Sequence, residues 1–266
     1  MRPQIMGILN VTPDSFSDGG QFVDAGKAVA RGLEMAEQGA QIIDIGGEST
    51  RPGADSVSQK SELKRVLPVI KALRAKNINA EISIDTRRPE VAKQAVAAGA
   101  SIWNDVTALT HKRGSIAMAA QLGCKVVLMH MQGTPKSMQK APSYDNVVAE
   151  VHGYLKQRVQ ACADGGIEAN KLILDPGIGF GKRLDDNLDL LQRFDDLYAL
   201  GCPILIGTSH KSFIGMIDDS KAAGRLGGSI ASALWAASLG ASYLRVHDVA
   251  ETVQAVKVWH AIRKRA

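Results

Sequence analysis

Residues 171–182, KLILDPGIGFGK, show the pattern that decides the fold. A short apolar run, Leu172 to Leu174, ends at the carboxylate of Asp175, and a glycine-rich turn follows. Apolar runs of this kind are typical of buried strands. Similar runs recur at intervals of roughly 25 to 40 residues, and nearly every one ends in a polar or ionisable residue. The eight runs are residues 5–10, 41–44, 81–85, 101–105, 125–130, 171–175, 203–208 and 242–247.

Helical patterns lie between these runs. Apolar residues recur at steps of three and four around Val29, Val91 and Val147, as on the buried face of a helix. Strand and helix therefore alternate eight times, which predicts an α/β fold, a (β/α)8 TIM barrel with a single domain over residues 1–266. Because the carboxyl ends of all strands meet at one mouth of such a barrel, we expect the polar residues that end the runs to share one pocket.

Composition narrows the class of protein. The sequence contains no stretch of 18 apolar residues, and its first residues lead directly into a strand, so we expect no membrane span, no signal peptide and a cytoplasmic location. The three cysteines, Cys124, Cys162 and Cys202, lack metal-ligand spacing and are predicted to be reduced packing residues. The formal net charge of +5 suits anionic small molecules as well as nucleic acid. The one dense basic cluster, residues 263–265, has no interleaved aromatic residues, so we predict no nucleic-acid partner.

Three irregular segments are longer than the usual strand-to-helix loop. They are residues 11–24, 49–58 and 134–144, whereas such loops usually contain about 2 to 6 residues. Long ordered loops at a barrel mouth are commonly lids, and we expect that role for the first two segments.

Polar residues end the third, fourth and sixth runs. The turn after Asp175 lacks the spacing of a P-loop, and its carboxylate can instead pair with the amidine or guanidine edge of a heterocycle. Asp85 and Asn104 end neighbouring runs and should lie side by side. Each of them taken alone can be a helix cap, but the cluster favours recognition of a pterin or purine edge.

Cationic residues follow the last two runs. Lys211, Arg245 and His247 stand where such barrels usually bind phosphate, and Ser212 is expected near the start of the next helix. Two alternatives stay open at this point. Lys211 can instead be a Schiff-base nucleophile, and His247 can be a buried imidazole bonded to the adjacent aspartate.

The second run leads into a loop that contains a hydroxyl and a guanidinium group, both suited to binding a substrate. After Asp44 this loop carries Thr50 and Arg51, and the following Pro52 favours an extended Arg51 that reaches outward as a clamp. His130 is predicted to be a wall of the pocket. The residues show no zinc grouping, whereas Asn10 near a diphosphate would suit Mg²⁺, which prefers oxygen ligands.

Taken together, these motifs resemble one enzyme family. Residues 8–20, NVTPDSFSDGG with its preceding Ile-Leu, and residues 46–54, GGESTRPGA, resemble the two signature loops of the dihydropteroate synthases. Residues 175–182, 209–212 and 245–249 resemble the later motifs of this family, so the resemblance covers essentially the whole chain. It implies a folate-pathway transferase that condenses 6-hydroxymethyl-7,8-dihydropterin diphosphate with 4-aminobenzoate, works as a homodimer and has mobile first and second loops.

The resemblance also implies roles for particular residues. The pterin would be held by Asp85, Asn104, Met129, Asp175, Gly207 and Lys211. The diphosphate would be held by Asn10, Thr50, Arg51, Arg245 and His247, with Asn10 on Mg²⁺. The aminobenzoate would be bordered by Phe16, Pro52, Phe180 and Ser212. The catalytic residues would be Asp85, Lys211, Arg245 and His247. One departure is His210, which stands where the family usually has arginine.

Two related classes are alternatives. A barrel that transfers a methyl group from methyltetrahydrofolate would share the pterin residues, but it has no need of the residues implied for the diphosphate. A non-catalytic pterin-binding homologue would be expected to have lost a signature loop, and this chain retains both.

Overall fold

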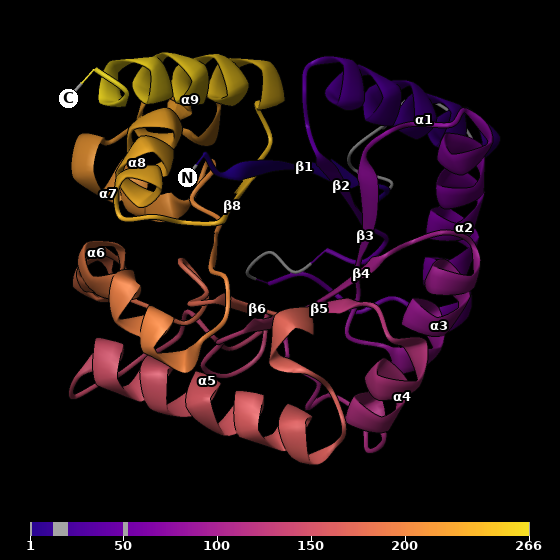
Figure 1. The fold of residues 1–266 in the computed structure, drawn as a ribbon, viewed down its shortest axis with the longest axis horizontal. Coiled ribbons are helices and arrows are strands. Elements are labelled where there is room, and N and C mark those ends of the chain that lie inside the picture. The colour runs from indigo at the N-terminus through magenta and orange to yellow at the C-terminus, as the bar shows by residue number, and fades with distance from the viewer. Residues whose placement is uncertain (1, 13–20, 50–52, 266) are drawn as a thin grey trace.

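The computed structural model describes residues 2–12, 21–49 and 53–265, and within them strands and helices alternate (Figure 1). In chain order the elements are β1 (Gln4–Asn10), α1 (Gln21–Glu37), β2 (Ile42–Gly46), α2 (Gln59–Ala75), β3 (Glu81–Asp85), α3 (Pro89–Ala97), β4 (Ile102–Asp105), α4 (Ser115–Leu122), β5 (Lys125–Met129), α5 (Val147–Asp164), η2 (Ala169–Lys171), β6 (Leu172–Asp175), α6 (Leu184–Arg193), η3 (Phe194–Leu200), β7 (Leu205–Ile206), α7 (Ser212–Asp218), η4 (Ala222–Gly224), α8 (Leu226–Ser238), β8 (Tyr243–Val246) and α9 (Val249–Arg263).

The strands form one parallel sheet that closes on itself. Their order is β6-β5-β4-β3-β2-β1-β8-β7, and a parallel bridge between Leu174 and Ile204 joins the two outer edges. Helices surround the strands (Figure 1). The predicted (β/α)8 barrel is therefore confirmed.

Several predicted boundaries are wrong, and β2 continues to Gly46 instead of ending at Asp44. The strand expected over residues 203–208 is only Leu205–Ile206, because Pro203 has no N–H to donate to a neighbouring strand and the chain leaves the ladder at Gly207. The loop expected over residues 11–24 ends earlier, since α1 already begins at Gln21.

Side chains alternate between the inside of the barrel and the helices, as the period of two in a strand requires. The floor of the barrel is filled by one apolar layer, formed by Met6, Ile42, Ile102, Val127, Ile173, Leu205 and Tyr243. Two residues further along the same strands, the inward positions become largely polar. They are Ile8, Asp44, Asn104, Met129, Asp175, Gly207 and Arg245.

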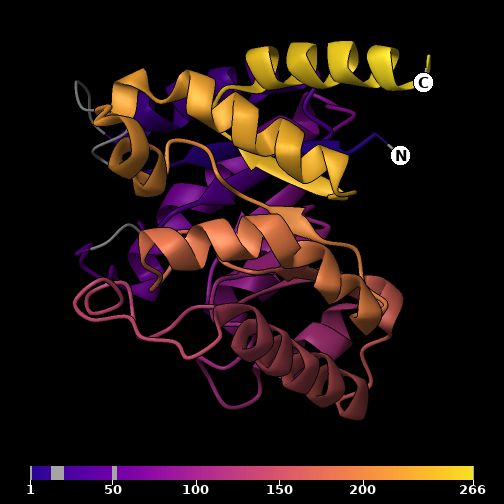
Figure 2. The same ribbon diagram turned by 90° about the vertical axis from the view of Figure 1, so that its left-hand side faces the viewer.

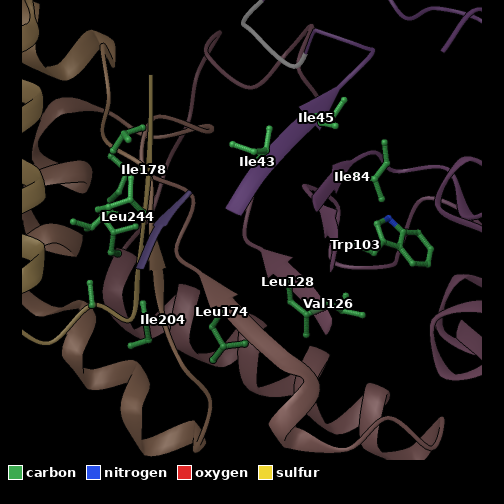
Figure 3. Close-up of a cluster of buried hydrophobic side chains, with 14 of the residues drawn as sticks. Ile43, Ile45, Ile84, Trp103, Val126, Leu128, Leu174, Ile178, Ile204 and Leu244 are labelled. Atoms are coloured by element: carbon green, nitrogen blue, oxygen red, sulfur yellow. The ribbon is translucent and has the colours of Figure 1, made fainter. Parts of the chain in front are cut away.

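The outward positions pack against the helices in one continuous core. Figure 3 shows part of this core, with Ile43 from β2, Trp103 from β4 and Leu174 from β6. The three cysteines lie in this core, buried and unpaired, as predicted. Within the described parts of the chain, none of the helices combines the length and apolar character needed to cross a membrane.

The loops that follow the strands lie on one side of the barrel. Figure 2 shows the two chain ends on one side and the segment after β5 projecting on the opposite side. The carboxyl ends of the strands thus form a mouth away from the termini.

Candidate active site

One level of the sheet places the predicted residues at the mouth. The strand register pairs Asn10 with Gly46, Gly46 with Asp85, and Asp85 with Asn104. Gly46 lies between these neighbours, and a Cβ at this position would be in ordinary van der Waals contact with Asp85 Cβ (3.6 Å) and Asn10 Oδ1 (3.7 Å). Asp85 and Asn104 lie side by side, as their positions in the sequence predict.

Arg245 joins this level to Asp44. Its Nε donates to Asp44 Oδ2 at 2.7 Å, and its Nη2 donates to Asp85 Oδ2 at 2.7 Å. The Asn104 side-chain amide also donates to Asp44 Oδ2, at 3.0 Å. Helix α3 begins after Arg88 and has no side-chain cap bond, so Asp85 is not its cap. Sequence reasoning missed the role of Asp44, although its place two residues before Gly46 puts it on the same inward face.

Burial and charge oppose each other in this network. Burial raises the pKa of Asp85, and the Arg245 guanidinium acts against this rise. Burial alone would lower the pKa of Arg245, but Asp44 and Asp85 hold it above its ordinary value. The arginine therefore stays cationic and offsets part of the buried negative charge.

Asp175 lies at the end of β6 and also organises the turn after it. Its Oδ1 accepts the backbone N–H of Gly177 at 2.7 Å. Burial raises its pKa, against this hydrogen bond and the nearby Lys211. Gly177 has φ +70°, and a Cβ there would lie 1.9 Å from the carbonyl oxygen of His130. Glycine is therefore required by both conformation and close approach.

A buried lysine, which sequence reasoning missed, supports this turn. The exposed fraction of Lys182 is 2%, and its Nζ donates to the carbonyl oxygens of Gly177 (2.9 Å) and Phe180 (3.1 Å). It also contacts His130 Nδ1 at 3.0 Å. Burial lowers the pKa of Lys182 to about 7, and burial together with Lys182 lowers the pKa of His130 to about 3. His130 is thus a neutral support beneath the turn.

Apolar side chains form one wall of the mouth. Met129 and Phe180 pack in a small cluster with Val106 and Met138. Lys211 Nζ lies 4.0 Å from the centre of the Phe180 ring. The segment after β5 reaches the same wall, where Tyr144 donates to the carbonyl oxygen of Gly181 at 2.7 Å. Three residues with predicted site roles, Met129, Phe180 and Lys211, are therefore brought together.

The loop after β7 holds His247. Ser209 Oγ accepts the backbone N–H of His247 at 3.2 Å and lies 3.0 Å from its Nδ1. Beside it, His210 Nε2 lies 2.7 Å from Asp248 Oδ2. The other ring nitrogen of His210 lies 2.7 Å from the carbonyl oxygen of Ala222. His210 thus links the loop after β7 to Asp248, which follows β8.

Several predicted positions remain to be placed. Gly207 follows β7 beside Arg245, and Ser212 is the first residue of α7. The other predicted positions, Phe16, Thr50, Arg51 and Pro52, lie outside the described residues. Among those that are described, no three His, Cys, Asp or Glu side chains form a group that could hold a metal ion.

These features define a barrel enzyme whose mouth can bind a polar ring that carries an anionic group. Carboxylates and an amide at its mouth suit a donor-rich ring, and nearby cations suit an anionic group. The model of the pterin-binding enzyme family matches residues 6–247. The dihydropteroate synthase of Escherichia coli (strain K12) is 49% identical over 260 residues, which cover 98% of this chain and 92% of the relative. That of Haemophilus influenzae is 47% identical over 97% of this chain and 94% of the relative.

Solved structures give the same result. The dihydropteroate synthase of Xanthomonas albilineans with 4-aminobenzoic acid is 50% identical, has a TM-score of 0.93, and is matched over 98% of this chain and 93% of that chain. A sulfonamide complex of the Yersinia pestis enzyme is 45% identical with a TM-score of 0.93, over 99% and 95% of the two chains. The present chain belongs to the dihydropteroate synthase family of pterin-binding enzymes.

Proposed function

We propose that this chain joins 4-aminobenzoate to 6-hydroxymethyl-7,8-dihydropterin diphosphate and releases 7,8-dihydropteroate and diphosphate. The amine nitrogen bonds to the pterin methylene carbon, the bond from this carbon to the diphosphate oxygen breaks, and the amine loses one proton. The observation that carries the proposal is the set of polar side chains at the barrel mouth, where Asp85 pairs with Arg245 beside Asn104 and the buried Asp175 ends β6. A similar Xanthomonas albilineans structure contains 7,8-dihydropteroate.

The pterin ring is assigned to the rigid strand ends. Its amidine edge donates hydrogen bonds, and the buried carboxylate of Asp175 accepts them in a charge-assisted pair. Asp85 and Asn104 contribute further polar contacts, with Lys211 opposite and with Met129 and Gly207 lining the ring. Negative charge beside the ring also favours the electron-poor methylene carbon that forms as diphosphate departs.

Departure of diphosphate is the main catalytic task. An aromatic amine is neutral at pH 7 and a weak nucleophile, so a strong general base adds little. Arg245 and His247 at the end of β8 stabilise the charge that grows on the leaving oxygen. Asn10, Thr50 and Arg51 hold the rest of the diphosphate.

The aminobenzoate is assigned to the outer part of the mouth. Phe180, which lies under the Lys211 ammonium group, forms one border. Ser212 at the start of α7 forms a second, and Phe16 and Pro52 complete the set. Water is kept from the reactive methylene when these groups and the substrate fill the mouth.

We assign Mg²⁺ to Asn10. The amide oxygen of Asn10 is at the mouth, and an amide oxygen together with substrate oxygens suits a cation that keeps several non-protein ligands. When bound, the cation would neutralise charge on the diphosphate. Calorimetric titration of Mg²⁺ with inorganic diphosphate present should give weaker binding for Asn10→Ala than for the wild type, and equal binding would refute the assignment.

A direct assay tests the proposed reaction. The protein incubated with pterin diphosphate, Mg²⁺ and 4-aminobenzoate should form dihydropteroate and diphosphate in equal amounts. Binding of the pterin without product would indicate a non-catalytic homologue, and methyl transfer from methyltetrahydrofolate would indicate the other pterin-binding class.

We also propose that the protein is a homodimer through α6, α7 and α8. Large apolar side chains are exposed on these helices, including Met216 (57%), Ile217 (61%) and Trp235 (50%). Trp235 Nε1 donates to the carbonyl oxygen of Leu191, which joins α8 to α6 in one surface. Light scattering should show a dimer for the wild type and for Ile262→Asp on α9, and a monomer for Ile217→Asp. A monomeric wild type would refute this proposal.

A cytoplasmic location is proposed on the state of the thiols. Cys124, Cys162 and Cys202 are all buried and unpaired, which suits a reducing compartment. Fractionation of cells that express the protein would test this location.

A further inference from the structure

An ion pair between Glu48 and Arg88 joins the two ends of the segment from residue 48 to residue 57, which follows β2. Glu48 Oε1 accepts the backbone N–H of Val57 at 3.0 Å, and Arg88 Nη2 donates to the carbonyl oxygen of the same residue at 2.6 Å. Arg88 Nη2 also donates to Glu48 Oε1 at 2.9 Å. The backbone N–H and carbonyl groups of Val57 are thus both hydrogen-bonded to the Glu48–Arg88 ion pair. Glu48 and Val57 are nine residues apart in the chain, so this contact joins the two ends of the segment.

The ion pair is buried and reinforced on both sides. Side-chain exposure is 8% for Glu48 and 11% for Arg88. Arg87 adds two further bonds to the Glu48 carboxylate, at 3.0 and 3.2 Å, and the buried Glu62 pairs with Arg88. Burial alone would raise the pKa of Glu48, but the hydrogen bonds from Arg88 and Arg87 hold it below its ordinary value. Charge-assisted bonds in such a setting are the strong ones.

Other contacts hold the segment between these ends. The carbonyl oxygen of Gly47 accepts from Arg65 Nη1 at 2.7 Å. A Cβ at Gly47 would lie 2.8 Å from Val66 Cγ1, so α2 presses directly on the start of the segment. Further along, the N–H of Gly53 donates to the carbonyl oxygen of Pro135 in the loop after β5 at 3.0 Å.

We propose that Glu48 and Arg88 are positioning residues for substrate binding. They set the separation between Glu48 and Val57, the two ends of the stretch whose sequence contains Thr50, Arg51 and Pro52, the residues proposed to meet the diphosphate and the aminobenzoate. A segment with fixed ends has fewer conformations to lose when it binds. The contribution of those three residues to binding rests on the proposed function, whereas the clamp itself does not.

Hydrogen exchange of the ligand-free protein tests the clamp. In Glu48→Ala the Val57 amide should exchange about tenfold faster than in the wild type, because it loses its acceptor. Arg88→Gln is a second variant, which removes the cation of the ion pair and should also speed exchange of the Val57 amide. Glu81→Gln is the matched control, since it breaks the ion pair with Lys125 at the opposite end of β3. Unchanged Val57 exchange in folded Glu48→Ala and Arg88→Gln would overturn the proposal.

A double-mutant cycle tests the positioning role. Glu48→Gln should lower kcat/KM for pterin diphosphate by up to about 10²-fold, and it should have little further effect when combined with Arg51→Ala. The affinity for the pterin alcohol, which lacks diphosphate, should stay unchanged.

Additive losses in the cycle, or an equal loss for the pterin alcohol, would mean that Glu48 supports only the fold and would overturn the positioning role. A silent Arg51→Ala in an active wild type would overturn it as well. A wild type that forms no dihydropteroate would refute the proposed function instead, and Val57 exchange would still decide whether the clamp exists.

Discussion

The carboxylate of Asp175 has a structural role in the turn after β6 and a proposed role in pterin binding. Asp175 accepts the Gly177 N–H that shapes the turn, and it also faces the mouth. Its turn contact needs only an oxygen, which asparagine could supply, whereas recognition of a donor-rich ring needs the charged form. The two tasks can therefore be separated by one substitution.

Asp175→Asn should lower the affinity for pterin by about 2 to 5 kcal/mol, because an NH₂ group would then face donors. Isothermal titration calorimetry with the pterin alcohol measures this loss directly. Asp195→Asn on the exposed surface of η3 serves as the control. A change below a few tenths of a kcal/mol (within the usual spread for surface substitutions) would leave Asp175 as a turn residue only.

The His130 and Lys182 pair predicts how stability depends on pH. The pKa of His130 is lowered to about 3 in the folded protein, whereas an unfolded histidine takes up its proton near pH 6.5. Between these values only the unfolded chain binds the proton, so this contribution to stability is lost as pH falls from about 6.5 to about 3.

Replacement of this imidazole should flatten the pH profile. The free energy of unfolding of wild type relative to His130→Gln should fall by about 1.4 kcal/mol per pH unit between pH 6 and 4. Urea unfolding at several pH values measures it, with His152→Gln on α5 as the control. Parallel profiles for wild type and His130→Gln would show that His130 is protonated in the fold.

Among the elements, the turn after β6 illustrates dependence on local backbone conformation. Gly177→Ala should lower the free energy of unfolding by more than about 2 kcal/mol, because it combines left-handed strain with a clash against the His130 carbonyl oxygen. Gly153→Ala is the matched substitution inside α5, where a Cβ meets nothing within 4 Å. It should raise stability by about 0.5 to 1 kcal/mol. Equal urea midpoints for the two variants would contradict this account of the turn.

The elements also show what sequence patterns predict well. Strand β3 begins and ends where its apolar run does, Glu81–Asp85, because that run is bounded on both sides by polar residues. Strand β7 is shorter than its run because pairing depends on which backbone groups find a partner, and Pro203 offers no donor. Tyr144 supports the β6 turn from the loop after β5, and Lys182 supports it from the end of the turn itself. No periodicity in the sequence reports either contact.

At the scale of the whole molecule, the barrel was predictable from the alternation of strands and helices, and with it the side-by-side positions of Asp85 and Asn104. The charge balance inside the barrel was not. Arg245 and Asp44 are 201 residues apart in the chain, and their contact follows from barrel closure and from the inward face that both strands present. Arg245 therefore neutralises buried carboxylates in the fold, in addition to its proposed role in stabilising the departing diphosphate.

Removal of Arg245 should affect both tasks, and a second substitution can separate them. Arg245→Met leaves the carboxylates of Asp44 and Asp85 buried without their cation, which should lower the free energy of unfolding by about 3 to 5 kcal/mol. Turnover should fall by about 10² to 10³ through loss of a contact to the leaving oxygen. Adding Asp44→Asn removes one buried charge, so urea unfolding should show that most of the stability returns.

The kcat of this double variant is the decisive measurement. It should stay low, because no cation faces the departing diphosphate, and kcat should be reduced more than KM is raised, since negative charge on the leaving oxygen grows in the transition state. If kcat returned together with stability, Arg245 would act through the fold alone. Stabilisation of the leaving group would then have to be assigned to the cations of other strands, with Lys211 the first to test.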